Sequence, residues 1–100
     1  MNNNFKKTKF ETPVLFLVFN RPETTSKVFE MIRKAKPPRI YIACDGPRNN
    51  RKNEIEKIAE VKKIVTNVDW TCQVYTLFRN RNLGCKKAVS EAISWFFKNE

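Results

Sequence analysis

The side chains that could bind a ligand or react gather in three short segments, each of which follows a run of residues typical of a β-strand. These segments are residues 20–21, 45–51 and 79–87. They hold seven of the chain's twenty basic residues, which are Arg21, Arg48, Arg51, Arg79, Arg81, Lys86 and Lys87. Asp45 is the one carboxylate among them. An anionic ligand with one group that needs a hydrogen-bond acceptor would suit this combination.

The first two segments each offer one candidate binding residue and one plain structural alternative. Asp45 directly follows a strand-like run, where its carboxylate could accept the imide N–H of uracil. An aspartate before glycine also commonly bonds its own backbone in a turn, and that interpretation stays open. Arg21 could bond a base or a phosphate through its planar guanidinium, or remain a solvated loop arginine.

The third segment leads into a helix-like run through Asn82 and Gly84, with Lys86 and Lys87 close behind. The free N–H groups at a helix start favour an anion, and a glycine lets the backbone approach it closely. In the alternative interpretation Asn82 caps the helix and Gly84 relieves the turn. Neither G-x-G-x-x-G nor G-x-x-x-x-G-K occurs, so a phosphate site here would be of another type.

Several common chemistries are excluded by composition. The chain has no histidine, so it can form neither a catalytic triad nor a histidine-paired thiolate. Glu54 and Glu56 stand two apart on an expected helix and therefore diverge, which removes them as a paired acid and base. Cys44, Cys72 and Cys85 form no C-x-x-C pair, so we expect reduced core thiols, with Cys85 a packing residue.

The apolar pattern predicts strands alternating with helices. Strands are expected at residues 14–19, 39–44 and 71–78, the first of them covered on both faces. Helices are expected from Pro22 to the Pro37-Pro38 pair, from the polar loop 49–53 through Val68, and after Gly84. This βαβαβα order predicts an α/β fold, a three-layer Rossmann-like domain with a parallel sheet. Open sheets of this kind bind ligands outside the carboxyl ends of their strands, where the three segments meet.

Length and charge indicate the number of domains, the compartment and the kinds of ligand to expect. One hundred residues suffice for one domain, expected at residues 13–100 behind a flexible leader at 1–12. The longest apolar run has six residues, too few to span a membrane, and no secretory signal is present, so the expected compartment is the cytoplasm. A net charge of +10 attracts polyanions and anionic small molecules, and it would also permit peripheral docking on anionic lipid.

The three exit segments, N-R-P, C-D-G-P-R and R-N-x-N-L-G, together resemble the first half of a GT-A nucleotide-diphospho-sugar glycosyltransferase. The chain is most similar to bacterial sugar transferases of the N-acetylglucosaminyltransferase I type, over residues 13–99. The resemblance implies a domain that binds a UDP-sugar within an enzyme that transfers a hexosyl or N-acetylhexosaminyl group. The acceptor in such enzymes is a glycan or polysaccharide.

The resemblance also implies roles for individual residues. Asn20 and Arg21 would meet the uridine or its phosphates, and Asp45 would accept from the uracil imide. The loop of Asn82 and Gly84, together with Lys87, would line the diphosphate side of the same pocket.

One departure from the family pattern is large. The family carries an acidic motif after its next strand, which binds a divalent cation, Mn²⁺ or Mg²⁺, against the diphosphate. The only aspartates here are Asp45 and Asp69, so no metal cofactor is expected within this chain. We therefore expect the N-terminal piece of a longer transferase, which by itself binds the nucleotide and transfers nothing.

Two other classes compete with this hypothesis. A basic nucleic-acid-binding module would use the +10 charge, but no helix-turn-helix, zinc or aromatic RNA-binding signature supports it, so no specific nucleic acid is expected. A phosphoacceptor regulatory domain would use Asp45 at the end of its strand, but it lacks the acidic cluster that holds a cation.

Overall fold

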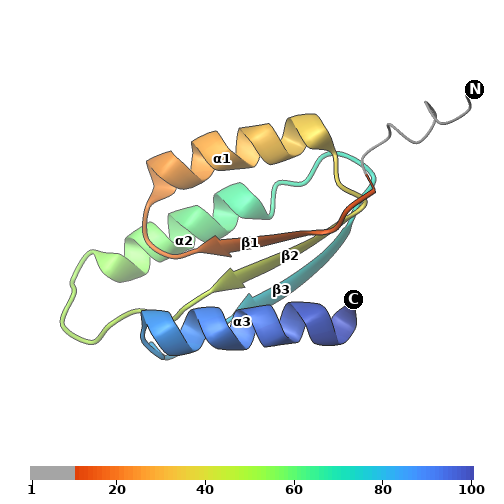
Figure 1. Ribbon diagram of the computed structural model, residues 1–100. Helices are drawn as coiled ribbons and strands as arrows, with labels where there is room; N and C mark the ends of the chain where they lie inside the picture. The colour runs from red at the N-terminus through yellow and green to blue at the C-terminus, as the bar shows by residue number, and fades with distance from the viewer. Residues whose placement is uncertain (1–10) are drawn as a thin grey trace, which may run out of the picture.

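The computed structural model describes residues 11–100, so most of the leader expected at residues 1–12 lies outside the described residues. Six elements alternate along the chain: β1 (Val14–Val18), α1 (Pro22–Ala35), β2 (Arg39–Cys44), α2 (Glu54–Val65), β3 (Gln73–Phe78) and α3 (Cys85–Asn99). The predicted α/β class and βαβαβα order are confirmed (Figure 1).

The three strands form one parallel sheet in the order β1-β2-β3. In register, Phe16 of β1 lies opposite Ile42 of β2, which lies opposite Thr76 of β3. Helices α1 and α2 cover one face of the sheet and α3 covers the other, which gives the expected three layers (Figure 1). Because α1 and α2 each connect neighbouring parallel strands in the same direction, right-handed crossovers place both on one face.

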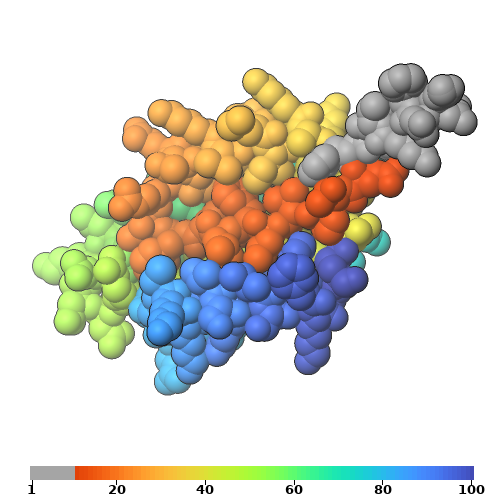
Figure 2. All heavy atoms as spheres, in the orientation of Figure 1, coloured from red at the N-terminus to blue at the C-terminus, as the bar shows by residue number. Residues whose placement is uncertain are grey.

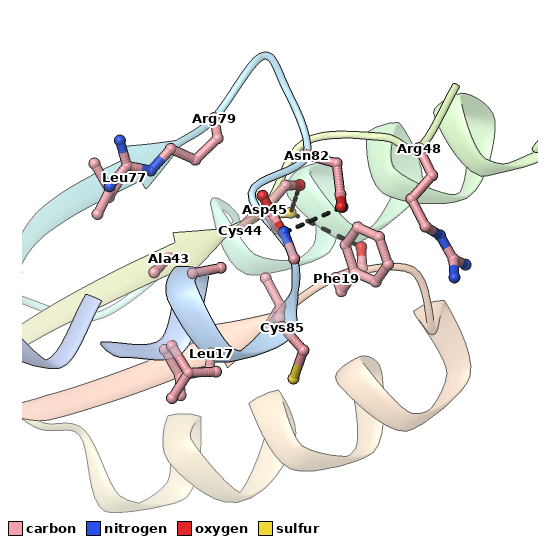
Figure 3. Close-up of a pocket in the computed structure, with 14 residues that line it drawn as sticks. Leu17, Phe19, Ala43, Cys44, Asp45, Arg48, Leu77, Arg79, Asn82 and Cys85 are labelled. Atoms are coloured by element: carbon pink, nitrogen blue, oxygen red, sulfur yellow. Dashed lines mark hydrogen bonds between the residues drawn. The ribbon is translucent and has the colours of Figure 1, made fainter. Parts of the chain in front are cut away.

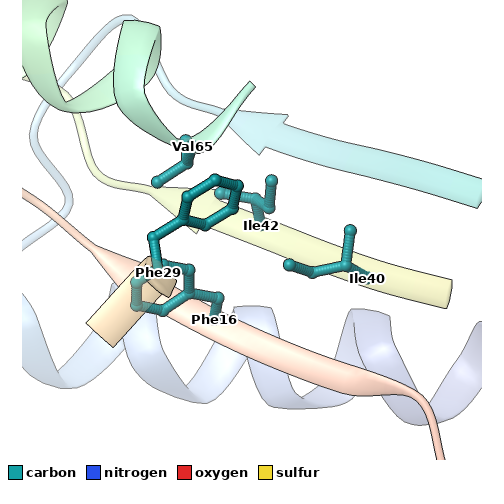
Figure 4. Packing of buried hydrophobic residues seen from close by; sticks show 5 residues of the cluster. All are labelled: Phe16, Phe29, Ile40, Ile42 and Val65. Carbon is teal, nitrogen blue, oxygen red and sulfur yellow. The ribbon is translucent and has the colours of Figure 1, made fainter. Parts of the chain in front are cut away.

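The main hydrophobic core lies between the sheet and helices α1 and α2 (Figure 4). Ile40 and Ile42 alternate along β2 and point to this side, and both are fully buried. Phe29 of α1 is 1% exposed and stacks on Phe16 with ring centroids 6.4 Å apart. Val65 of α2 completes the cluster. This core buries one face of β2, and the carboxyl end of β2 leads directly to Asp45.

Strand β1 is an edge strand, and the expectation that residues 14–19 are covered on both faces is wrong, because Phe16 packs in the core while Leu17 lines an open pocket. Leu17 is 41% exposed, whereas the central strand β2 is buried from Ile40 through Cys44. Figure 2 shows β1 uncovered in a band between α1 and α3. An apolar run indicates that a strand is largely buried, but the order of strands in the sheet determines which strand is central.

The helix starts follow the sequence closely and one helix end does not. Pro22 opens α1, and α1 ends before Lys36, which adopts a left-handed conformation with φ of 49°. Helix α2 ends at Val65 rather than at the expected Val68, because the N–H of Asn67 bonds the carbonyl of Ile64, three residues back, and the helical pattern stops there. Over residues 11–100, none of the helices is both long enough and apolar enough to cross a bilayer.

Helix α3 is anchored at its far end by an aromatic and ionic cluster. The Tyr41 hydroxyl donates to Glu100 Oε2 at 2.7 Å, which raises the pKa of Tyr41 to about 12. The ring of Tyr41 also meets Trp95 and Phe96 edge-on, with centroids 5.2 and 5.0 Å away. Phe97 of the same helix is 69% exposed and takes no part in this cluster's contact with Tyr41. This cluster packs the C-terminal end of α3 against the sheet. The helix therefore lies along the sheet, with its first turn near the carboxyl ends of the strands.

Candidate functional site

A pocket of about 380 Å³ lies between the carboxyl end of the sheet and the first half of α3 (Figure 3). Its floor is apolar and consists of Leu17, Ala43, Leu77, Ala88 and Val89. Its polar lining comes from the exit loops of β2 and β3 and consists of Asp45, Arg48, Arg79 and Asn82, with Gly84 and, from the exit of β1, Phe19 beside them. The rule that ligands bind outside the carboxyl ends of parallel strands predicted this position.

The carboxylate of Asp45 ties two of these loops together. Its Oδ1 accepts from the backbone N–H groups of Gly46 at 2.8 Å and Leu83 at 2.9 Å. Its Oδ2 accepts from the N–H of Gly84 and the amide of Asn82, both at 3.1 Å. A carboxylate has about four acceptor positions, so all are in use. The turn interpretation of Asp45 is confirmed by the bond to Gly46, and a ligand N–H would have to replace one of the two longer bonds.

Asn82 does not cap α3, so the capping interpretation of this residue is wrong. Its side-chain amide donates to Asp45 and to the carbonyl of Gly46, at 3.1 and 2.8 Å. The residue at the N-cap is Gly84, which has φ of 91° and offers no side chain. The expectation that Gly84 relieves the turn is confirmed, because this φ favours glycine. Asn82 therefore joins the two loops instead of closing the helix.

Arg48 and Phe19 form one wall at the mouth of the pocket (Figure 3). The guanidinium carbon of Arg48 lies 5.6 Å from the centre of the Phe19 ring, which is a cation–π distance. A planar cation beside an aromatic ring offers stacking surface and hydrogen-bond donors to a planar anionic ligand. In the sequence, Arg48 stands out only as one of the basic residues, and no local signal marks Phe19.

Glu54 fixes Arg48 from behind and is the most important residue that the sequence analysis missed. It is the first residue of α2 and is 4% exposed, whereas Glu56 is exposed, so the two carboxylates do diverge. Glu54 accepts from the backbone N–H of Arg48 at 2.8 Å, from Arg48 Nε and Nη2, and from the Asn20 amide at 2.8 Å. The hydrogen bonds from the Arg48 side chain lower the pKa of Glu54 to about 2, against the effect of burial.

This low pKa predicts an acid-sensitive fold. The ordinary pKa is 4.5, so the stabilisation from ionised Glu54 is complete above pH 4.5 and is lost as pH falls toward 2. We expect Glu54→Gln to be less stable than the wild type at neutral pH and to lose less stability on acidification. Urea unfolding at pH 5, 4 and 3 measures this difference. Glu56→Gln is the matched control, and equal pH slopes for Glu54→Gln and the wild type would contradict the prediction.

Arg79 lies on the side of the pocket opposite Arg48, and its ionic partner is a residue of α3 rather than of α2. Its Nη2 donates to Glu91 of α3 at 2.7 Å, and its backbone N–H donates to the carbonyl of Cys44 at 3.0 Å. The second bond extends the pairing of β2 and β3 beyond the strands. Arg79 thereby stays at the edge of the sheet, with its side chain lining the pocket.

The sequence-predicted site residues fall into three groups. Asp45, Asn82 and Gly84 line the pocket together. Asn20 and Arg21 line an adjoining groove beside β1, which shares Arg48 with the pocket. Lys87 is exposed on the first turn of α3 and lines neither hollow.

The three cysteines differ in exposure. Cys44 is buried, and burial raises the pKa of its thiol to about 11, as expected for a core thiol. Cys72 is partly buried, and Cys85 is exposed at the start of α3. The expectation that Cys85 packs in the core is wrong, because the first turn of α3 meets the open pocket rather than the sheet.

The residues present do not fit a divalent cation. Within residues 11–100, no three histidine, cysteine or acidic side chains cluster as a metal site would require. The pocket offers one carboxylate, that of Asp45, and its oxygens already accept four hydrogen bonds.

Comparisons of the chain with protein-family models, with curated proteins and with solved structures gave no match. The fold and the site define a class of protein on their own: a parallel α/β domain with a pocket at the carboxyl edge of its sheet.

Proposed function

We propose that this chain binds the nucleotide of a UDP-sugar in the pocket at the carboxyl edge of its sheet. The observation that carries the proposal is the make-up of that pocket, an apolar floor under a rim with two arginines and one carboxylate. A volume of about 380 Å³ lies within the range of small-molecule sites, roughly 300–1,000 Å³. Such a site suits a ligand with a planar part and a charged part.

The planar part of the ligand is assigned to the apolar side of the pocket. A uracil ring fits between the floor and the wall formed by Phe19 and Arg48. Its imide N–H then replaces the Asn82 amide on Asp45 Oδ2, one of the two longer bonds of that carboxylate. Ring and acceptor together favour uracil over a purine, which is larger and presents a different edge.

The charged part is assigned to the start of α3 and to Arg79. The first turn of α3 carries Lys86 and Lys87 and no acidic residue. Cations at the positive end of a helix dipole are unfavourable, and a bound anion offsets this repulsion. The free N–H groups of the same turn can donate to phosphate oxygens.

The larger proposed role is that of the nucleotide-binding part of a glycosyltransferase that moves a hexosyl or N-acetylhexosaminyl group to a glycan acceptor. Its support is the resemblance of the three exit loops to GT-A transferases and the position of these loops at one edge of the sheet, around the pocket and the groove beside it. The donor would be met in the cytoplasm, where free thiols such as those of the three cysteines persist.

Titration calorimetry with UDP, with ADP and GDP as controls and with and without manganese, tests the proposal. We expect UDP to bind about tenfold more tightly than the other two, with no effect of manganese. Equally weak binding of all three that disappears with added salt would contradict it. That outcome would point to a basic surface for nucleic acid, whose affinity depends steeply on salt.

A further inference from the structure

Glu54 is a buried carboxylate that does not line the nucleotide pocket, yet it contacts a residue that does. Its side chain is 3% exposed, whereas the side chain of its partner Arg48 is 43% exposed. Burying a charge costs free energy unless hydrogen bonds compensate, and here Arg48 and Asn20 supply them. The carboxylate thus connects the exit loops of β1 and β2 through the start of α2.

The geometry of the ion pair leaves part of Arg48 available. Glu54 accepts from Nε and Nη2, so the two Nη1 protons face away from the carboxylate. The same guanidinium stands 5.6 Å from the Phe19 ring. The Nε and Nη2 groups of Arg48 are therefore bonded to the buried carboxylate of Glu54, while the Arg48 side chain also lines the pocket.

An arginine in an exposed loop normally samples many rotamers, and ordering it for binding costs side-chain entropy. Glu54 offsets that cost before any ligand arrives. The other charged groups around this carboxylate, Arg51, Lys52 and Lys57, are all cationic and line the hollow on its outer side. None of these three donates a hydrogen bond to Glu54, so Arg48 is the one cation that this carboxylate holds, with Asn20 as its neutral donor.

We propose that Glu54 is a positioning residue, which holds the guanidinium of Arg48 beside Phe19 in the orientation that receives the nucleotide. This inference rests on the proposed nucleotide binding and adds a residue that acts on the ligand only through Arg48.

A double-mutant cycle with UDP affinity as the readout tests the inference. The variants are Glu54→Gln, Arg48→Ala and the two combined, measured by calorimetry at pH 7. Glu54→Gln is expected to weaken UDP binding about tenfold in the wild-type background and to have no further effect once Arg48 is alanine. A purely structural role of Glu54 would lower affinity equally in both backgrounds, and that result overturns the inference.

A spectroscopic readout makes the test independent of affinity. In the wild type, the Arg48 Nε–Hε resonance should be protected from solvent exchange by the carboxylate. Glu54→Gln should abolish this protection, and Glu56→Gln, which removes the same charge from an exposed position, should leave both the resonance and UDP affinity unchanged. If Glu54→Gln does not fold, Glu54→Asp keeps the charge but shortens the side chain by one CH₂ group, so it must also lose this protection and weaken UDP binding.

The outcomes separate the two proposals. A wild type that fails to bind UDP overturns the proposed function, and the role of Glu54 in binding falls with it. A wild type that binds UDP, alongside a folded Glu54→Gln that binds equally well, overturns the positioning role alone.

Discussion

Asp45→Ala is expected to lower the free energy of unfolding by about 2–4 kcal/mol and to abolish measurable UDP binding. Four hydrogen bonds end on this carboxylate, three from backbone N–H groups and one from the Asn82 amide. Alanine would leave the N–H groups of Leu83 and Gly84 without this acceptor, and they lie in a part-buried loop. The loop before α3 should then detach from the exit of β2, and the pocket between them should open.

The control for this variant is Asp69→Ala, which changes the only other aspartate. Asp69 is exposed and pairs with Arg33 at the surface, so its loss should cost less than about 1 kcal/mol and leave UDP binding intact. Urea unfolding and calorimetry measure the two effects. Asn82→Ala keeps the carboxylate but removes the two bonds from the Asn82 amide to Asp45 and Gly46, so it should weaken the tie between the loops less than Asp45→Ala does. Unchanged UDP affinity in Asp45→Ala would show that the assigned pocket is wrong.

Gly46→Ala is expected to lower the free energy of unfolding by about 2–3 kcal/mol and to weaken UDP binding strongly. A Cβ at position 46 would lie 2.5 to 2.7 Å from the backbone atoms of Arg81. Backbone cannot swing aside as a flexible side chain does, so residues 79–84 must move as a unit. That movement would stretch the bonds from Asn82, Leu83 and Gly84 to residues 45 and 46.

Gly84→Ala is the matched control, because it changes the only other glycine and meets a different constraint. A Cβ at position 84 has no neighbour within 4 Å, but φ of 91° disfavours alanine. We expect a cost of about 1–3 kcal/mol from this backbone conformation, without displacement of the loop. Amide chemical shifts of Arg81 and Leu83 distinguish the two variants. Larger shifts there in Gly84→Ala than in Gly46→Ala would contradict the prediction.

Much of the fold could be predicted because its signals are local. Apolar runs at residues 39–44 and 71–78, helical spacing between them, and prolines at the start and end of α1 each act over a few residues. Parallel strands then bring their carboxyl ends to one edge, which placed Asp45, Asn82 and Gly84 around one pocket. The prediction erred for Leu17 and for Cys85, whose exposure depends on which element lies opposite.

The contacts that build the site join residues far apart in the chain, and their pattern had no local signal. Asn82 is of a residue type that often caps helices and stands just before α3, yet it donates to Asp45, thirty-seven residues earlier. Glu54 is an ordinary acid in a first helical turn, yet it joins Asn20, thirty-four residues away, to Arg48.

By itself, the sequence determined the alternation of strands and helices, the charge of the chain and the three loops that carry its binding groups. Only the tertiary structure decided that β2 is central and β1 an edge, that the Asp45 carboxylate is already fully hydrogen-bonded, and that Glu54 anchors Arg48. The physical reason is one of range. Periodicity and turn chemistry act between near neighbours, whereas burial and the choice of hydrogen-bond partner depend on strand order and on the face that each helix covers.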